Sequence, residues 1–556
     1  MTKMSGARFF AETLHGYGVS HVFFMPVITI SAMKEMEALG IKRVMTHGEK
    51  AAAYMADGYA RVSGKTGICM AQSVGAANLA AGLQDPYLAG SPVLAVTGRR
   101  PEGEQQRHAY QEVDHRGPFS AVTKYSAKVT SVEALPQALR QALRESVSGQ
   151  PGPAHLDLDG ITGQDIETAE ADLDVIVEAP FTAVPAFRPE PDPDSVSAMA
   201  AVIANAEKPI IVSGGGVKHS GAGAELVSLA EKLSIPVATS LNGRGTIPDD
   251  HPLCVGVVGL YSRWSANRAV SEADLVIYVG CAAGGMVTNE GQVPGPGARV
   301  VQIDIDPREL GRNYPVIAAI QSDARAALIA LAAASTARTG ANAWVDHVAG
   351  LVTDWRAEVE PLLTADSVPI RTERLCRELT THMPEDAILV SDTGHSGIWT
   401  GTMIELLHPG QDYIRCAGSL GWAFPAALGA KCAAPDRPVI CFAGDGAIWY
   451  HLTEMETAVR CGINTVTVIN NNHSLNQEKH INEDFYGGQT AGSDELWIFP
   501  ESDFAKIAES MGGLGLTVER PEDFAGALAQ ALASGRPAII DVKTDIESIT
   551  PPPWVP

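Results

Sequence analysis

The chain of 556 residues has no hydrophobic run that approaches the roughly 20 residues needed to cross a membrane. Its N-terminus lacks the long apolar core of a signal peptide, and its eight cysteines show no paired spacing. Basic charge is also scarce, since 41 Lys and Arg against 65 Asp and Glu give a net charge of −24. These absences argue against a membrane span, secretion and binding to nucleic acid or anionic membranes. They predict a cytoplasmic protein with reduced cysteines.

Length and composition instead predict several globular domains. A chain of this length exceeds what one hydrophobic core supports, and 45% of its residues are hydrophobic. A proline-rich acidic stretch at 181–195 and an alanine-rich stretch at 332–369 interrupt the chain. We therefore predict an N-terminal domain at residues 1–180, a central domain at 190–335 and a C-terminal domain at 370–556.

Each of these three regions alternates apolar strands with helical patterns. In the central region, Pro209–Ser213 and Leu275–Gly280 are two such apolar runs. Strands that alternate with helices usually pair in parallel. The predicted fold class is α/β, with three doubly wound parallel-sheet domains, of which the central one is Rossmann-like.

Two polar residues follow neighbouring predicted strands of the C-terminal region. Asp445 lies between Gly444 and Gly446, and Asn472 ends the run of asparagines after the next strand. The glycines allow backbone amides to approach a phosphate, and carboxylate and amide oxygens suit Mg²⁺, which keeps substrate phosphates in its shell. The pattern predicts a metal-diphosphate site, with a backbone carbonyl near Ser474 as a further ligand. A surface turn before an asparagine-rich loop is the alternative.

The segments around these residues explain why they could meet. Apolar strands are predicted at 439–443 and 465–469, and a helix from Trp449 to Cys461 connects them. Parallel strands end at the same edge of a sheet, where open α/β sheets bind ligands. The two candidate metal ligands are therefore expected at one sheet edge.

With this motif the sequence resembles the thiamine diphosphate enzymes of the acetolactate synthase, benzoylformate decarboxylase and 2-hydroxyacyl-CoA lyase group. The resemblance extends over nearly the whole chain. Residues 47–61 resemble the segment that supplies the family's cofactor-activating glutamate, and residues 72–78 its Ser-Gly-Pro-Gly-Ala-Thr-Asn turn, with Val74 replacing the proline. Residues 110–114 correspond to its Phe-Gln-Glu segment and residues 418–425 to its cofactor-wedge segment.

The resemblance implies roles for particular residues. Glu49 would hydrogen-bond the cofactor's pyrimidine ring, so that the cofactor's own amine becomes the base. Leu420 would hold the cofactor bent. The implied sites are catalytic Glu49, Gln111 and Glu478; cofactor-binding Gly75, Asn78, His395, Ser396, Gly418, Leu420, Gly444 and Gly446; and metal-binding Asp445, Asn472 and Ser474.

Each of the two glutamates could instead be a surface residue without a catalytic role. Glu49 beside Lys50 has the pattern of a solvated helix pair, and Glu478 beside Lys479 that of a surface ion pair. Glu478 stands where pyruvate decarboxylase carries an active-site glutamate. A carboxylate there could exchange a proton with a substrate hydroxyl or carbanion.

The resemblance also implies an assembly. Glu49 and Asp445 belong to different domains, and in relatives such residues meet across a subunit interface. A homodimer or homotetramer is therefore expected. In the central region, Gly214–Gly216 and Gln302–Asp306 follow predicted strands and are compatible with ADP, or with FAD. The glycine fingerprint is incomplete, so a purely structural domain is the alternative.

The substrate signals conflict. Pro26–Val27 and residues 123–128 resemble the 2-hydroxyacyl-CoA lyases, whereas residues 392–396 and 418–425 do not. The leading expectation is a thiamine diphosphate- and Mg²⁺-dependent C–C lyase or carboligase that cleaves a 2-hydroxyacyl-CoA to formyl-CoA and a ketone or aldehyde. Arg99, Arg100 and Arg107 are candidate contacts for CoA phosphates. The alternatives are acetolactate-synthase-like condensation, 2-oxoacid decarboxylation and a non-catalytic thiamine-binding homologue.

Overall fold

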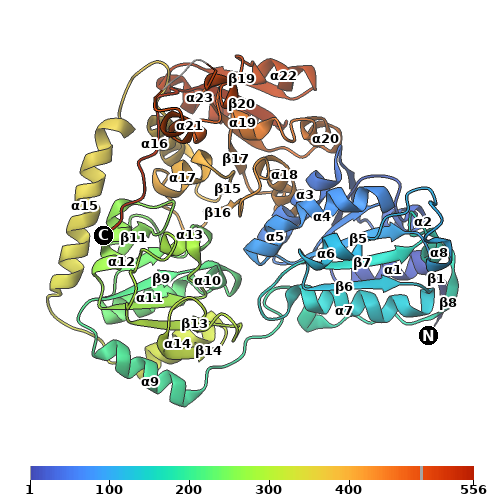
Figure 1. The fold of residues 1–556 in the computed structure, drawn as a ribbon, viewed down its shortest axis with the longest axis horizontal. Helices are drawn as coiled ribbons and strands as arrows, with labels where there is room; N and C mark the ends of the chain where they lie inside the picture. The colour runs from blue at the N-terminus through green and yellow to red at the C-terminus, as the bar shows by residue number, and fades with distance from the viewer. Residues whose placement is uncertain (1, 489–491) are drawn as a thin grey trace.

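The computed structural model describes residues 2–488 and 492–556, and it contains three α/β domains (Figure 1). Each domain is built on a six-stranded sheet in which every neighbouring pair of strands is parallel. A small antiparallel pair of β1 (Thr2–Ser5) and β8 (Glu170–Leu173) extends the first domain. The predicted fold class is confirmed.

The N-terminal domain has the strand order β3-β2-β4-β5-β7-β6. Its central strands β4 and β5 are buried along their whole length, because helices cover both faces of the sheet. The strands are β2 (His21–Phe24), β3 (Lys42–Met45), β4 (Gly67–Ala71), β5 (Val93–Arg99), β6 (Tyr125–Val129) and β7 (Ala154–Asp159). The main helices are α1 (Gly6–Gly16), α2 (Ile30–Ala38), α3 (Glu49–Ser63), α4 (Ala76–Gly82), α5 (Gln84–Ala89), α6 (Arg116–Ser120), α7 (Leu135–Val147) and α8 (Gln164–Thr168).

The C-terminal domain repeats this connection pattern with the order β16-β15-β17-β18-β20-β19. In both domains the order reverses between the first and third strands, which is where open α/β sheets bind ligands. The strands are β15 (Ile388–Ser391), β16 (Asp412–Arg415), β17 (Val439–Gly444), β18 (Val466–Asn471), β19 (Leu514–Val518) and β20 (Ala538–Lys543). The helices are α16 (Thr372–His382), α17 (His395–Thr402), α18 (Ala423–Ala433), α19 (Asp445–Ile448), α20 (Glu454–Cys461), α21 (Glu478–Phe485), α22 (Phe504–Ser510) and α23 (Phe524–Ala533).

The central domain has a different order, β11-β10-β9-β12-β13-β14, which is that of the Rossmann fold. The predicted strands at 209–213 and 275–280 are confirmed as β9 and β12. The strands are β9 (Pro209–Ser213), β10 (Val237–Thr239), β11 (Cys254–Val257), β12 (Leu275–Val279), β13 (Val300–Asp304) and β14 (Val316–Gln321). The helices are α9 (Pro193–Ala204), α10 (Gly215–His219), α11 (Gly223–Leu233), α12 (Trp264–Glu272), α13 (Gly285–Thr288) and α14 (Ala324–Ala334).

The N- and C-terminal domains pack against each other through α3 and α18, two helices at equivalent places in the two sheets. Glycines make this close crossing feasible. A Cβ atom at Gly58 would collide with the carbonyl oxygen of Ala426, and one at Gly429 with that of Met55. The crossing belongs to a continuous hydrophobic core that includes both helices.

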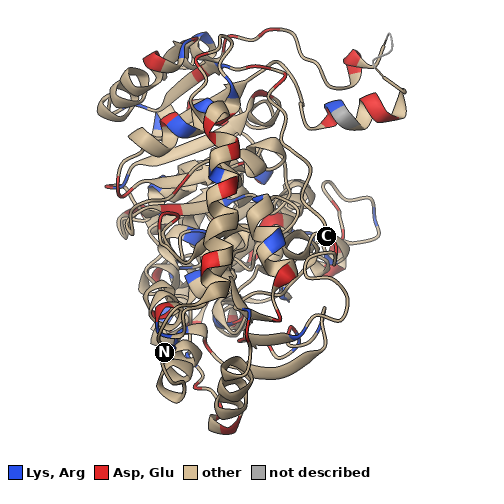
Figure 2. Cartoon of the chain, turned by 90° about the vertical axis from the view of Figure 1, so that its left-hand side faces the viewer, with Lys and Arg blue, Asp and Glu red and all other residues tan. Residues whose placement is uncertain are grey.

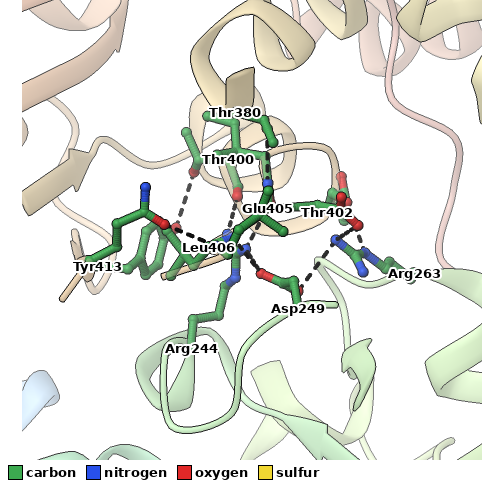
Figure 3. A network of polar contacts seen from close by, with 12 residues as sticks. Arg244, Asp249, Arg263, Thr380, Thr400, Thr402, Glu405, Leu406 and Tyr413 are labelled. Atoms are coloured by element: carbon green, nitrogen blue, oxygen red, sulfur yellow. Dashed lines mark hydrogen bonds and ion pairs between the residues drawn. The ribbon is translucent and has the colours of Figure 1, made fainter. Parts of the chain in front are cut away.

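Buried polar groups join the central and C-terminal domains (Figure 3). The guanidinium of Arg244 donates to Asp249 at 2.7 Å and to the carbonyl oxygens of Thr400 and Ile404. Arg263 donates to the carbonyl of Thr402 at 2.9 Å. The pairs are 1% to 8% exposed, so removing one partner would leave a buried charge.

The helix α15 (Ala343–Leu363) bridges the central and C-terminal domains. It runs down the front of Figure 2 and carries charged side chains. Within residues 2–488 and 492–556, no helix is both long and apolar enough to span a membrane.

The predicted helix from Trp449 to Cys461 is wrong at its start. Trp449 caps the short α19, residues 450–453 form turns, and α20 begins at Glu454. Leu452 lies in this turn, and its side chain is buried. It therefore has the apolar spacing that predicts a longer helix. The predicted strands on either side are confirmed as β17 and β18.

Candidate functional site

A cavity of about 260 Å³ opens at the carboxyl edge of the C-terminal sheet. Asp445, the first residue of α19, lines it and is 2% exposed. Burial raises the pKa of this carboxyl to about 7, although the backbone amides of Asp445, Gly446 and Ser474 oppose the shift. Its Oδ1 atom has no hydrogen-bond partner among the described residues. A carboxylate held in this way lacks a counter-ion.

Two neutral residues that could supply oxygen ligands accompany Asp445 in the cavity. Asn472, one residue beyond β18, and Ser474 are both 5% exposed and line it. The Ser474 hydroxyl donates to Oδ1 of Asn472 at 2.9 Å, which holds the two side chains together. In the described part of the chain, no three His, Cys, Asp or Glu side chains form a metal cluster. Oxygen donors of this kind fit Mg²⁺, which would complete its shell with phosphate oxygens and water.

Small residues shape the same cavity. A Cβ atom at Gly444 would lie 3.6 Å from the Ser396 hydroxyl, whereas one at Gly446 would collide with Leu475. His395 and Ser396 open α17 and also line the cavity, and the His395 ring meets the Trp399 ring edge-on at 6.2 Å. The predicted diphosphate-binding residues are therefore brought together with Asp445.

The loop before α18 carries the predicted wedge residue. Leu420 is half-buried, lines the cavity and packs against the core shared with the N-terminal domain. Gly418 lies farther along the loop and does not line the cavity. Its N–H donates to Asp85 at 3.2 Å.

Glu478 begins α21 at the rim of the same cavity. The alternative of a surface pair with Lys479 is wrong, because Lys479 pairs with Glu547 at 2.7 Å. No ion pair of Glu478 appears among the described contacts. Its carboxylate is half-buried and is available to a ligand in the cavity.

The remaining predicted residues form a second cluster in the N-terminal domain. Glu49 begins α3, and its carboxylate accepts a hydrogen bond from the Asn78 amide at 3.2 Å. A Cβ atom at Gly75 would collide with Oε1 of Glu49, so glycine lets the turn pack on this carboxylate. Gln111 adjoins the same turn, since its carbonyl accepts the Ser73 hydroxyl at 2.7 Å. Lys50 lies near aromatic rings, and no ion pair with Glu49 is described.

Among the described residues of one chain, the second cluster does not line the Asp445 cavity. The lining of the Asp445 cavity comes from the C-terminal domain and, through Tyr261, from the central domain. Glu49 lies at the carboxyl edge of the N-terminal sheet, after β3. Each of these two domains therefore carries one of the two predicted clusters.

Sequence reasoning missed the acids that hold the two halves in place. Asp85 is fully buried and accepts the N–H groups of Ala417, Gly418 and Ser419 at 2.9 to 3.2 Å. Conversely, Glu454 of the C-terminal domain accepts the N–H of His47 at 3.0 Å, just before Glu49. An acidic residue inside an apolar segment, as Asp85 is, was the available signal.

Asp392 is another missed acid, at the end of β15. It accepts the N–H groups of Gly421 and Ala423 at 3.0 and 2.9 Å. Burial raises its pKa to about 6. It ties the loop that carries Leu420 to the sheet edge from the other side.

A further cavity, of about 210 Å³, lies between the central domain and the N-terminal domain, which contributes residues 88–90 and 149–151 to its lining. Gly214, Gly216 and Gly280 line it, with Asp304 at the end of β13. Burial raises the Asp304 pKa to about 6. The glycines and the acid lie together at the sheet edge where Rossmann domains take a nucleotide.

Known proteins share this three-domain organisation. Residues 4–117 match the N-terminal TPP binding domain of thiamine pyrophosphate enzymes, residues 196–331 the central domain and residues 392–542 the C-terminal TPP binding domain. The chain is 32% identical to the probable acetolactate synthase large subunit of Methanocaldococcus jannaschii, over 98% of this chain and 92% of the relative. The chain belongs to the thiamine pyrophosphate enzyme family.

Other relatives in this family are similar at the same level. Identity is 31% with the acetolactate synthase large subunit of Corynebacterium glutamicum, over 97% of this chain and 86% of the relative. It is also 31% with acetolactate synthase isozyme 2 large subunit of Escherichia coli, over 99% and 97%. This thiamine pyrophosphate enzyme therefore spans nearly the full length of these relatives, and thiamine diphosphate is its cofactor.

Proposed function

We propose that this thiamine pyrophosphate enzyme is a Mg²⁺-dependent carboligase acting on small 2-oxo acids in the cytoplasm. The reaction would release carbon dioxide from one 2-oxo acid and join its acyl carbon to the carbonyl carbon of a second. The observation that carries the proposal is the cavity that places Asp445, Asn472 and Glu478 together. The names of the acetolactate synthase relatives support the carboligase class.

The residues divide the work between them. When bound, thiamine diphosphate supplies an acidic thiazolium carbon that can hold the electron pair released on decarboxylation. Asp445, Asn472 and a Ser474 backbone oxygen would hold Mg²⁺ and the diphosphate, and Glu49 would hydrogen-bond the pyrimidine ring. Glu478 at the cavity rim would exchange a proton with the substrate oxygen. Gln111 would orient the substrate from the opposite half.

A homodimer is part of this proposal, and two such dimers could form a tetramer. Among the described residues of one chain, Glu49 does not line the Asp445 cavity. Their own domains are fixed to each other by the α3–α18 crossing. A second chain can bring its N-terminal half-site to the C-terminal half-site of the first. Active sites would then lie at the subunit interface.

The 2-hydroxyacyl-CoA lyase has weaker support than the carboligase. Arg99 is 3% exposed and pairs with Asp159 at 2.6 Å, so it is wrong as a CoA-phosphate contact. Arg100 donates to the Tyr110 carbonyl and to Glu104. Of the three arginines suggested for CoA, Arg107 alone remains exposed.

A nucleotide in the central domain, ADP or FAD, remains a proposal that the glycine-lined cavity supports. A flavin would colour the purified protein, whereas ADP would appear in a perchloric acid extract. Both measurements need no assay of turnover.

The function is tested with purified protein, thiamine diphosphate and Mg²⁺. Pyruvate should yield carbon dioxide and a condensed hydroxy-oxo acid detectable by mass spectrometry. Formyl-CoA release from 2-hydroxyisobutyryl-CoA would instead establish the lyase. Carbon dioxide and a free aldehyde from pyruvate or benzoylformate would establish a simple decarboxylase. Cofactor binding without any turnover would establish a non-catalytic homologue.

A further inference from the structure

A second cavity, of about 410 Å³, lies where the three domains meet. Residues 60–64 and Ala89 of the N-terminal domain line it, together with α10 of the central domain and β16 of the C-terminal domain. In Figure 1, α5, α10 and β16 converge near the middle of the molecule. The cavity shares no lining residue with the Asp445 cavity.

Four cationic side chains line this junction cavity, and three of them have carboxylate partners. Arg61 is held by Asp57 and Asp85 at 2.6 and 2.9 Å. The other two pairs are Arg188 with Asp323 at 3.0 Å and Lys218 with Asp412 at 2.5 Å. These three cations are accounted for by the fold.

Arg415, the last residue of β16, is the exception. It is 7% exposed and lines the cavity, and its Nε atom is buried without a partner. Within residues 2–488 and 492–556, no carboxylate lies within ion-pair distance of its guanidinium, and no acceptor takes a hydrogen bond from it. Its backbone carbonyl, in contrast, accepts Arg61 at 2.6 Å and so fixes the end of the strand.

Loss of a proton cannot neutralise the buried guanidinium of Arg415. Arginine stays charged in proteins, and an uncompensated buried charge is strongly destabilising. Buried charges are therefore normally paired. Arg415 lines the cavity, so a negative group entering the cavity could pair with its guanidinium.

His219, the last residue of α10, adds a neutral hydrogen-bonding group. It lines the cavity and has no described hydrogen bond. Burial, together with Lys218 and Arg61, lowers the pKa of its imidazole to about 4. Near neutral pH it would therefore contact a ligand as a neutral donor and acceptor, and Arg415 would supply the charge.

We propose that the junction cavity binds a small metabolite through an oxyanion, a phosphate or a carboxylate, held by Arg415. The planar guanidinium binds either group through two parallel hydrogen bonds. The cavity volume falls in the range of metabolite-sized sites. Gly215, His219 and Asn242 line both this cavity and the central-domain cavity. The oxyanion can therefore come from a free metabolite or from the phosphates of a nucleotide in the adjoining cavity.

The test uses holoenzyme saturated with thiamine diphosphate and Mg²⁺, so that the diphosphate site is filled. Thermal unfolding and titration calorimetry are carried out with inorganic phosphate, pyruvate and ADP, each against sodium chloride of equal ionic strength. The variants are R415M, which keeps the volume but removes the charge, and R415K, which keeps the charge but loses the planar fork. R520M is the matched control, because Arg520 is exposed and pairs with Glu522.

At least one oxyanion should bind wild-type protein and R520M with one site per chain and raise their unfolding temperature. R415M should lose at least 90% of this response, and R415K should bind more weakly than wild type. Without oxyanion, R415M should unfold at or above the wild-type temperature. A response to phosphate or pyruvate identifies a free metabolite, and a response to ADP alone identifies a nucleotide.

Two results would overturn the proposal. One is an equal oxyanion response of R415M and wild type, which would place binding elsewhere. The other is the absence of any response in wild type beyond that to chloride, whatever the stability of R415M. If R415M does not fold, an undiminished response of R415K would count against the guanidinium contact.

Discussion

The N-terminal and C-terminal domains share one strand order but carry different chemistry. In both, the loop after the second strand and the turn after the third form the sheet edge used by the site. The N-terminal domain offers Glu49, half-buried at the start of α3 beneath a turn that needs glycine at position 75. The C-terminal domain offers Asp445, which is deeply buried and whose Oδ1 has no partner among the described residues. In the proposed function, the first half would exchange protons and the second would hold a cation.

The two domains also support each other in a reciprocal way. Asp85, in the helix after the third strand of the N-terminal sheet, accepts the backbone of the loop before α18. Glu454, after the third strand of the C-terminal sheet, accepts the backbone of the loop before α3. The same topological place therefore carries an acid that positions the other domain's loop. The comparison can be tested at both ends.

The largest effect is expected for Glu49→Gln. If Glu49 hydrogen-bonds the cofactor ring, turnover should fall about 10²- to 10⁴-fold, the usual contribution of a positioned acid or base. The unfolding temperature and cofactor affinity should change little, because Glu49 has one described partner, Asn78. Glu37→Gln, on the exposed side of α2, is the control. Unchanged turnover in E49Q would contradict the role proposed for Glu49.

Asp445→Asn should act on the other half, through the metal. We expect the Mg²⁺ concentration for half-maximal cofactor binding to rise at least about 100-fold, since loss of a ligand should exceed the 10- to 100-fold effects of outer-shell changes. Quenching of tryptophan fluorescence by thiamine diphosphate at several Mg²⁺ concentrations measures this shift. A Mg²⁺ dependence like that of wild type would contradict Asp445 as a ligand.

The pH dependence of metal-free protein should also distinguish the halves. The folded-state pKa of Asp445 is raised from 3.8 to about 7, so its protonated form favours folding and stability falls as pH rises from about 4 to about 7. At about 1.4 kcal/mol per pKa unit, the loss approaches about 4 kcal/mol. Urea unfolding at pH 4 and pH 8 measures it. D445N should flatten the slope, and saturating Mg²⁺ should flatten it in wild type; equal slopes in metal-free D445N and wild type would exclude this origin.

The α3–α18 crossing tests whether the two domains form one unit. Gly58→Ala and Gly429→Ala should each lower the free energy of unfolding by about 1 to 3 kcal/mol, because the added methyl groups meet backbone oxygens that cannot retreat. Gly526→Ala in α23 is the matched control, since its methyl would meet nothing within 4 Å. The control should be neutral or stabilising by up to about 1 kcal/mol. Equal effects at all three positions would mean that the crossing can relax.

The smallest effects are expected for the reciprocal acids. Asp85→Asn should weaken thiamine diphosphate binding about tenfold, because three backbone N–H groups lose a charged acceptor. Glu454→Gln should have a smaller effect, since it accepts one N–H and the Thr457 hydroxyl at 2.7 Å. Calorimetric titration of cofactor into each variant measures both. A larger loss of cofactor affinity in E454Q than in D85N would contradict this prediction.

Much of the fold could be predicted because strands buried on both faces leave continuous apolar runs. The strands at 209–213 and 439–443 are of this kind and were placed within a residue of their ends. The helix start at Trp449 was misplaced because Leu452, in a turn, has the spacing of a helical residue. Apolar spacing reports burial and not backbone hydrogen bonding.

The site was predictable where one short motif carries its chemistry, as around Asp445. Contacts between distant segments were not, since neither Asp85 nor Arg415 has a local pattern that names its partner. Asp85 lies more than three hundred residues from the loop it holds. The inferred role of Arg99 failed for the same reason, because its ion pairs depend on where β7 lies beside β5.

The glycine-to-backbone fit between α3 and α18 also bears on how a coenzyme could be exchanged. Because that fit joins two domains of one polypeptide, a movement that separates these domains within a single chain would have to break this closely packed contact. In the proposed dimer, separating the two chains would leave this contact intact. Loading and loss of the coenzyme would then follow association and dissociation of the subunits, and dilute samples would lose it first.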